Sequence, residues 1–205
     1  MLDDKVCVAI LAGGLSSRMG GGIKTLKTFN NKTIFERIFS KIKTQCNNII
    51  INTNEDNFQF KKYNVSIIKD IFLERVGPLG GLHACLKWLN LKNKNIDWLV
   101  TVPADTPFLP DNLVEKLIKE ARNGKYKIVM AKSNDKIHPI VGIWHSSLLE
   151  HLEQEINLGT RKILHWAKKH TIKYVEFNNS NYDHFFNINY KEDILKAEEI
   201  ENNQI

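Results

Sequence analysis

The chain has 205 residues, 42% of them hydrophobic and 25% charged, a composition typical of a soluble globular protein that buries about 70% of its unfolded surface. Its formal net charge is +6, but the lysines are spread along the whole chain, so we expect an anionic small molecule as ligand and not nucleic acid. Three scattered cysteines without a Cys-x-x-Cys pair, no signal peptide and no apolar run of ~18 residues predict a cytoplasmic protein that neither holds structural zinc nor enters a membrane.

The first predicted element is a strand over residues 6–10, whose apolar β-branched residues are typical of a buried parallel strand. It ends at Ala12 in a glycine-rich loop that also holds two serines and the cations Arg18 and Lys24. Glycine has no Cβ, so backbone N–H groups in such a loop can approach a ligand closely. Arginine offers a fork of donors that matches phosphate oxygens, and lysine a mobile point charge. The strand and loop therefore predict a polyphosphate site.

The common glycine patterns do not describe this loop. A P-loop needs glycine directly before its lysine, and here Ile23 stands between Gly22 and Lys24. The dinucleotide pattern G-x-G-x-x-G could start only at Gly20, and its last position is Thr25. The loop therefore matches neither of these two phosphate-binding patterns.

Helical and strand patterns then alternate to the end of the chain. Thr33 and Glu36 are spaced as a capping box at the start of the first helix. We expect helices over residues 33–45, 78–91, 110–122, 148–156, 161–169 and 191–200, and strands over 48–52, 65–69, 98–102, 128–131, 140–144 and 173–177. This alternation with short links predicts a single domain over residues 1–205, in which helices cover both faces of a mostly parallel sheet in a three-layer α/β/α, Rossmann-like arrangement.

Polar residues follow several of the predicted strands. Asn52, Asp70 and Asp105 come at or just after strand ends, as the glycine loop does. In open α/β sheets, ligands bind beyond the carboxyl ends of the strands, so we expect these groups at one edge. Asn and Asp also cap turns routinely, which is the ordinary explanation for any one of them.

The loop sequence L-A-G-G-x-S-x-R-M-G-x-x-x-K resembles the opening of the molybdenum-cofactor guanylyltransferase (MobA) family of nucleotidyltransferases. The matching residues are Leu11, Ala12, Gly13, Gly14, Ser16, Arg18, Met19, Gly20 and Lys24. The segment Pro103-Ala104-Asp105-Thr106-Pro107 is similar to the family's second motif. One departure is Ile23, where the family usually has Asp before the lysine. The resemblance covers nearly the whole chain, densely in the first half and thinly after Trp144.

The resemblance implies a sheet of the nucleotide-diphospho-sugar transferase type and transfer of GMP from GTP to the terminal phosphate of molybdenum-loaded molybdopterin, with release of pyrophosphate. It implies Mg²⁺ on Asp105 and a catalytic role for Arg18, Lys24 and Asp105. The nucleotide-binding residues that it implies are Leu11, Ala12, Gly13, Gly14, Lys24, Asn52, Asp70, Gly80 and Asp105. The acceptor-binding residues are His138, Arg161, Asn187 and Asn189. Residues 1–110 would form the nucleotide part and 111–205 the acceptor part.

Other functions remain open at this point. A cytidylyltransferase that makes the cytosine form of the cofactor, or another sugar- or polyol-phosphate nucleotidyltransferase, would share the same loop. A non-catalytic nucleotide-binding delivery module would bind GTP without releasing pyrophosphate. We expect a monomer or weak oligomer, with other cofactor-biosynthesis proteins or molybdoenzyme chaperones as candidate partners.

Overall fold

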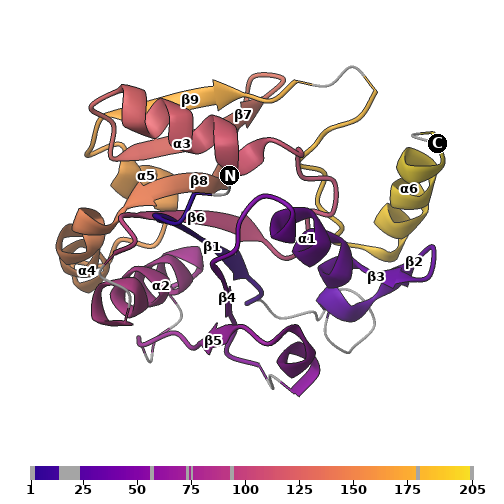
Figure 1. Cartoon of the computed structure of the whole chain (residues 1–205), viewed down its shortest axis with the longest axis horizontal. Coiled ribbons are helices and arrows are strands. Elements are labelled where there is room, and N and C mark those ends of the chain that lie inside the picture. The colour runs from indigo at the N-terminus through magenta and orange to yellow at the C-terminus, as the bar shows by residue number, and fades with distance from the viewer. Residues whose placement is uncertain are drawn as a thin grey trace.

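The computed structural model describes residues 3–13, 24–55, 58–72, 74, 76–92, 95–178 and 181–203, with residue 24 described by its backbone alone. Within these residues, seven strands form one sheet in the order β5-β4-β1-β6-β8-β7-β9 (Figure 1). Their bounds are β1 Val6–Leu11, β4 Ile49–Asn52, β5 Ser66–Ile68, β6 Trp98–Pro103, β7 Ile128–Ser133, β8 Lys136–His145 and β9 Ile172–Glu176. Strand β8 runs antiparallel to both of its neighbours, and the other pairings are parallel. The predicted mostly parallel sheet is confirmed.

The register of the central strands aligns their carboxyl ends. Leu11 of β1 is the partner of Asn52 on one side and of Pro103 on the other, and Asn52 is in turn the partner of Ile68. Parallel strands that end in register deliver the residues after them to the same edge. The segments after β1, β4, β5 and β6 therefore begin side by side.

Helices cover both faces of the sheet. Helices α1 (Ile34–Lys43), α3 (Leu113–Asn123) and α6 (Lys191–Asn202) contribute to one apolar core, and α2 (Pro78–Lys92), α4 (Leu149–Asn157) and α5 (Ile163–Ala167) to the other. Alternate residues of β1 enter opposite cores, as the two-residue period of a strand requires, so that Val8 packs with α1 and Ala9 with α2. This is the expected three-layer α/β/α arrangement. Among the described residues, no helix has the length and apolarity needed to cross a membrane.

The first helix begins as its sequence predicts. The N–H of Glu36 donates to Oγ1 of Thr33 at 3.0 Å, and the N–H of Thr33 donates to Oε2 of Glu36 at 2.8 Å. Both halves of the capping box are present, so two backbone donors at the start of α1 are satisfied.

Two short hairpins were not expected from the sequence. Strands β2 (Thr28–Phe29) and β3 (Lys32–Thr33) join through Asn30-Asn31, and β7 joins β8 through Asn134-Asp135. The four turn residues have φ between 44° and 63°, which asparagine and aspartate tolerate better than most side chains. These Asn and Asp pairs were the available signal for the hairpins.

Most element boundaries lie within two residues of expectation, and three elements differ more in their start or length. Helix α3 begins at Leu113, not at residue 110, because residues 110–112 form a turn before it. Helix α5 covers Ile163–Ala167, shorter than the predicted 161–169. Strand β8 begins at Lys136, so Pro139 lies inside a strand, where the register shift between Met130 and Ala131 of β7 accommodates a residue without an N–H.

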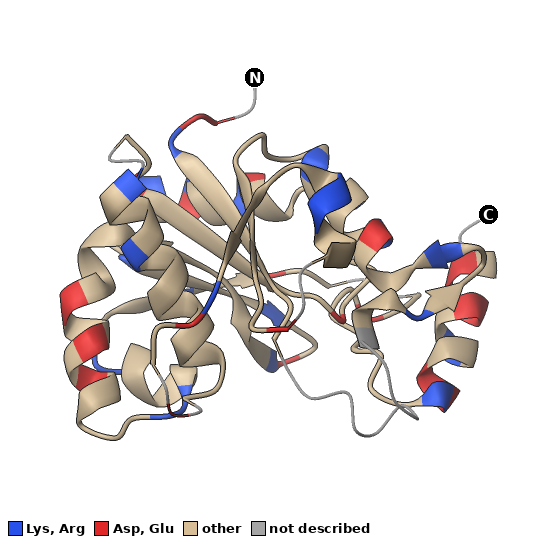
Figure 2. Cartoon of the chain, turned by 90° about the horizontal axis from the view of Figure 1, so that it is seen from below, with Lys and Arg blue, Asp and Glu red and all other residues tan. Residues whose placement is uncertain are grey.

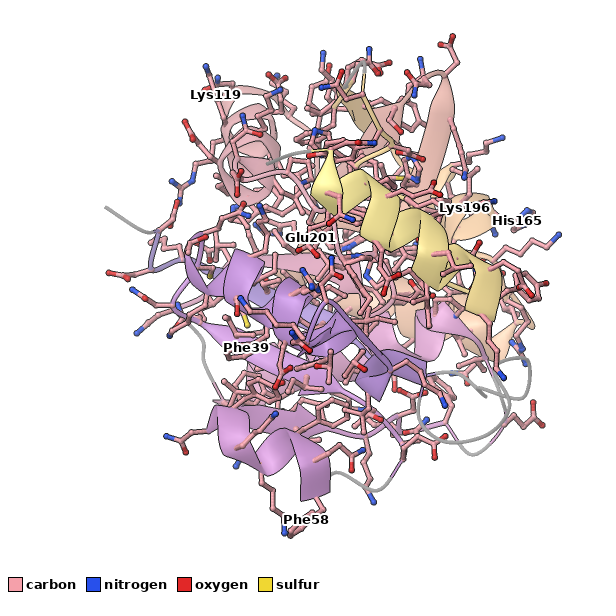
Figure 3. The ribbon with its side chains drawn as sticks, turned by 90° about the vertical axis from the view of Figure 1, so that its right-hand side faces the viewer. Phe39, Phe58, Lys119, His165, Lys196 and Glu201 are labelled. Carbon is pink, nitrogen blue, oxygen red and sulfur yellow. The ribbon has the colours of Figure 1, made fainter. Side chains whose placement is uncertain are left out.

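Charged residues of both signs lie on helices and strands around the molecule (Figure 2), consistent with the dispersal of lysine along the sequence. The C-terminal helix α6 lies beside α1 and the β2-β3 hairpin (Figures 1 and 3). It is joined to them by Glu201, which accepts hydrogen bonds from the guanidinium of Arg37 and from Nδ2 of Asn30 at 2.7 Å.

Candidate functional site

The site begins where β1 ends. The N–H of Ala12 donates to the carbonyl of Asn52 at 2.8 Å, and the N–H of Ala104 donates to the carbonyl of Leu11 at 3.1 Å. A Cβ added to Gly13 would meet none of the described residues within 4 Å. The predicted residues Gly14 and Arg18 lie outside the described residues, as does the side chain of Lys24, whose backbone opens a 3₁₀ turn, η2 (Lys24–Leu26).

An amide–carboxylate network follows β4 and β5. Nδ2 of Asn52 donates to Oδ1 of Asp70 at 2.8 Å and to the carbonyl of Ile68 at 3.1 Å. Nδ2 of Asn54 donates to Oδ2 of Asp70 at 2.9 Å, and its Oδ1 accepts the N–H of Asp70 at 2.8 Å. The structure therefore brings the predicted Asn52 and Asp70 together. It adds Asn54, which sequence reasoning missed although it follows Asn52 by two positions.

The start of helix α2 packs directly on this network. A Cβ on Gly81 would lie 2.3 Å from Oδ1 of Asn52. A Cβ on Gly80 would lie 2.6 Å from Cγ2 of Val76 and 3.2 Å from Oδ2 of Asp70. Real Cβ atoms do not approach other atoms this closely, so both positions need glycine for packing. The sequence predicted closeness to a ligand at Gly80, and the structure gives that residue a close protein contact.

A second group of polar residues follows β6. Asp105 is half-buried, and Thr106 is completely buried. The carbonyl of Asp105 accepts the N–H of Ile188 at 2.9 Å, and Oγ1 of Thr106 donates to Oδ1 of Asn187 at 2.6 Å. The predicted acceptor residue Asn187 thus lies beside the predicted metal ligand Asp105. Sequence reasoning did not identify Thr106, which joins them.

Asn189 and His138 both help to hold the chain in place near this group. The N–H of Asn189 donates to Oδ2 of Asp193 in the first turn of α6 at 2.8 Å. His138 is buried in β8, with its ring against Phe185, and Nε2 lies 2.8 Å from Oγ of Ser133.

The hydrogen bonds around Ser133 define the state of His138. The hydroxyl of Ser133 donates to Oδ1 of Asp183 at 3.1 Å, so its oxygen accepts a hydrogen bond from Nε2–H of His138. Burial lowers the pKa of His138, while the nearby Asp183 carboxylate acts in the opposite direction. Because the pKa of His138 is lowered overall, the ring is neutral at pH 7. Its bond to Ser133 and its contact with Phe185 hold residues 183–185 against the sheet.

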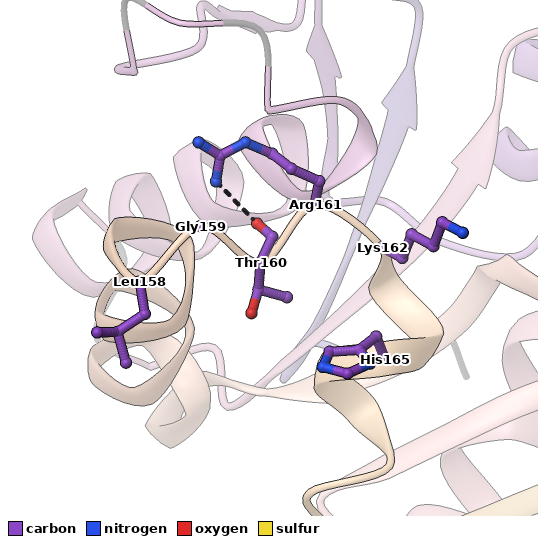
Figure 4. Close-up of a pocket in the computed structure, with 6 residues that line it drawn as sticks. All are labelled: Leu158, Gly159, Thr160, Arg161, Lys162 and His165. Atoms are coloured by element: carbon purple, nitrogen blue, oxygen red, sulfur yellow. Dashed lines mark hydrogen bonds between the residues drawn. The ribbon is translucent and has the colours of Figure 1, made fainter.

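Arg161 lies in the loop between α4 and α5, close to the start of α2. These helices cover the face of the sheet opposite to the one on which the segment around Asn187 packs. The loop lines an open pocket of about 400 Å³ with Lys162 and His165 (Figure 4). The guanidinium donates to the carbonyls of Ile156 at 2.8 Å and Thr160 at 3.0 Å and pairs with Glu74 at 3.4 Å. Most of its donors are thus bound within the protein, and the structure does not place it with the other three predicted acceptor residues.

Comparisons with known proteins are consistent with this geometry. A family model described as "MobA-like NTP transferase domain" matches residues 8–172. A relative from Nitrobacter hamburgensis, named molybdenum cofactor guanylyltransferase, is 36% identical over 192 residues, which are 93% of this chain and 92% of the relative.

Solved structures show the same fold. The crystal structure of molybdopterin-guanine dinucleotide biosynthesis protein A from Archaeoglobus fulgidus has a TM-score of 0.77 at 25% identity, covering 96% of this chain and 99% of that one. A CMP:2-keto-3-deoxy-manno-octonic acid synthetase complexed with CTP has a TM-score of 0.75 at 11% identity, covering 98% of this chain and 100% of that one. The second likeness concerns the fold alone and agrees with the expected nucleotide-diphospho-sugar transferase type of sheet.

Proposed function

The chain is a nucleotidyltransferase that belongs to the MobA-like NTP transferase family, and we propose from this membership that it transfers GMP from GTP to the terminal phosphate of molybdopterin. The observation that carries the proposal is the match to a guanylyltransferase over 93% of the chain, which includes both groups of polar residues at the sheet edge. In the reaction, a phosphate oxygen of the acceptor bonds to the α-phosphorus of GTP. The bond from that phosphorus to the bridging oxygen breaks, and pyrophosphate leaves.

The reaction does not need a general base to deprotonate the nucleophile. A phosphate monoester has a second pKa near ~6, so at neutral pH the nucleophile is already mostly dianionic. The barrier lies in bringing anions together and stabilising the charge of a loose transition state. A protein that performs this reaction must supply donors and positive charge at fixed positions.

We assign the triphosphate to the glycine loop. In this assignment the backbone amides of Gly13 and Gly14, together with Arg18 and Lys24, hold the phosphate oxygens. No described residue lies within 4 Å of a Cβ placed on Gly13, which supports a close approach. We assign the nucleoside to the segments after β4 and β5. The carboxylate of Asp70 has about four acceptor sites, of which two receive the amides of Asn52 and Asn54, so it can still accept donors from a nucleoside.

The residues present fit Mg²⁺ as an ion that arrives with the substrate. Within the described residues, no group of three or more His, Cys, Asp or Glu side chains could hold a metal. Mg²⁺ is commonly held by one or two carboxylates together with substrate phosphates, and the half-buried Asp105 offers one hard oxygen ligand group at the sheet edge. When bound, the ion would supply charge that stabilises the phosphate oxygens in the transition state.

We also propose that the enzyme acts in the cytoplasm. Cys7, Cys46 and Cys85 are free and buried, as is usual in a reducing compartment. Oligomeric state and delivery partners stay predictions from the sequence.

The test of the proposed function is pyrophosphate release by the purified protein with molybdopterin and each nucleoside triphosphate in turn. We expect release with GTP and molybdopterin together, and none when either is omitted. Release with CTP in place of GTP would make the protein a cytidylyltransferase. Binding of GTP without release with any acceptor would make it a delivery module.

A further inference from the structure

Thr106 makes a short hydrogen bond that the proposed reaction does not by itself require. Its hydroxyl oxygen lies 2.6 Å from Oδ1 of Asn187 and 3.4 Å from Oδ1 of Asp105. A hydroxyl group has one proton, so it can donate to one of these oxygens at a time. The shorter distance indicates that the Thr106 hydroxyl donates its hydrogen bond to Oδ1 of Asn187. Because Thr106 is completely buried, water does not compete for this bond.

The bond fixes which end of the Asn187 amide is available to a ligand. Thr106 holds the carbonyl oxygen, so the NH₂ group with its two donors lies at the other end of the amide. Asn187 is an exposed residue, and within the part of the chain that the structure describes its Nδ2 makes no hydrogen bond. The next residue, Ile188, is buried and donates its N–H to the carbonyl of Asp105 at 2.9 Å. Asn187 is therefore held beside Asp105 by its side-chain bond to Thr106 and by the backbone bond of its neighbour Ile188.

We propose that Thr106 is a positioning residue that makes Asn187 a hydrogen-bond donor to a phosphate oxygen of the acceptor substrate; this rests on the proposed function. Phosphate oxygens of a dianion only accept hydrogen bonds, so an amide beside them must present its NH₂ group. Without Thr106 the amide can rotate and turn its carbonyl oxygen toward the phosphate, which repels it. Thr106 does not contact the substrate and acts through Asn187.

The first test separates the Michaelis constants of the two substrates. Thr106→Val removes the hydroxyl at nearly unchanged size, and we expect the KM for molybdopterin to rise about tenfold, the usual effect of losing one hydrogen bond to a charged group. The KM for GTP should stay within about twofold, and Thr106→Ser should restore both values, since serine keeps the hydroxyl. Equal changes for both substrates would overturn the proposal.

A double-mutant cycle tests whether Thr106 acts through Asn187. Asn187→Ala should raise the KM for molybdopterin as much as Thr106→Val does, and the double variant should show no further rise, because the two residues form one unit. Independent effects that multiply would contradict the proposal. The matched control is Thr101→Val, since Thr101 is a buried threonine of β6 whose hydroxyl donates to the carbonyl of Ile140 at 2.6 Å. That variant should lower stability without a selective change in either KM.

A second readout needs no turnover. The side-chain ¹⁵NH₂ resonance of Asn187, identified by its absence in Asn187→Ala, reports the order of the amide in the free protein. In Thr106→Val these protons should shift and exchange faster with water, and an unchanged resonance would overturn the proposal. A wild-type protein that released no pyrophosphate but kept this dependence on Thr106 would contradict the proposed function while leaving the positioning role supported.

Discussion

Arg37 and Glu201 form an ion pair that joins the first helix to the last, although 164 positions separate them. The guanidinium lies 3.9 Å from the centre of the Phe29 ring and donates to the carbonyl of Phe29 at 2.8 Å. Arg37 is only 12% exposed and Glu201 26%. Partly desolvated pairs with several hydrogen bonds contribute more than exposed ones, so this contact holds α6 against the hairpin that follows the glycine loop.

Removal of Glu201 therefore tests how firmly the C-terminal helix is held. Glu201→Ala leaves the partly buried Arg37 without its anion, and we expect the free energy of unfolding to fall by about 2 kcal/mol. Urea unfolding measures this loss. Glu199→Ala, at an exposed position of the same helix, is the control and should change stability little. Equal stability of the two variants would mean that the pair contributes nothing.

Lys24→Ala tests the triphosphate assignment. Loss of one preorganised charge in a phosphoryl-transfer site costs about 3 kcal/mol, so we expect pyrophosphate release to slow by at least a hundredfold while the unfolding temperature stays unchanged. Lys32→Ala, at an exposed position of the nearby β3, should keep nearly the normal rate. A variant at position 24 with normal turnover would remove the lysine from the mechanism.

Asp105→Ala tests the metal assignment. If this carboxylate helps to hold Mg²⁺, its removal should shift the dependence of the rate on Mg²⁺ to at least tenfold higher concentration, since a charged ligand is lost. Titration of Mg²⁺ in the pyrophosphate assay measures the shift. Asp111→Ala is the control, because Asp111 is 84% exposed and paired with Lys41. An unchanged titration curve for the variant at position 105 would place the ion elsewhere.

Gly81→Ala sets helix propensity against packing. Alanine is favoured over glycine inside a helix by about 1 kcal/mol, so propensity alone would stabilise the variant. The added Cβ would lie 2.3 Å from Oδ1 of Asn52, so either helix α2 or Asn52, which is bonded to Asp70, has to shift. We expect a net loss of about 1–3 kcal/mol in thermal or urea unfolding, together with weaker GTP binding in calorimetry. A more stable variant would show that α2 can move away from the network freely.

The capping box predicts a dependence of stability on pH. The hydrogen bond from Lys62, with those from Thr33, lowers the pKa of Glu36 from its usual 4.5 to about 2. A lowered pKa stabilises the folded state fully above pH 4.5, and this contribution is lost as the pH falls toward 2. Wild type should therefore be more stable than Glu36→Gln at pH 7, and the difference should vanish near pH 2. A difference that does not change with pH would exclude this cause, and Glu192→Gln, exposed on α6, is the control.

The parts of the site that follow parallel strands could be predicted from the sequence. Asn52 and Asp105 lie at or just after apolar runs, and a parallel sheet places such residues at one edge without information on side-chain packing. The capping box at Thr33 could be predicted because it depends on four consecutive residues. Local patterns of this kind determine the strands and helices around the nucleotide side of the site.

The acceptor side was harder to predict because it depends on contacts between distant segments. The antiparallel direction of β8 follows from the turn Asn134-Asp135, which reverses the chain where the alternating pattern suggested continued parallel strands. The bond between Thr106 and Asn187 joins positions 81 residues apart, and neither residue has a local pattern that indicates its partner. Arg161 resembled an anion ligand, and its contacts in the structure, with the carbonyls of Ile156 and Thr160 and with Glu74, have no local sequence pattern that indicates them.

The attachment of Asn187 to the turn after β6 has a consequence for how the enzyme is made. During synthesis, residues 1–110 leave the ribosome well before the segment that places Asn187 beside Asp105 and Glu201 beside Arg37. A nascent chain can thus form the central parallel strands early. The acceptor side of the site, at the carboxyl ends of these strands, stays incomplete until residues 185–201 have emerged and docked. The same long-range closure should make docking of this segment a late, slow step in refolding from denaturant.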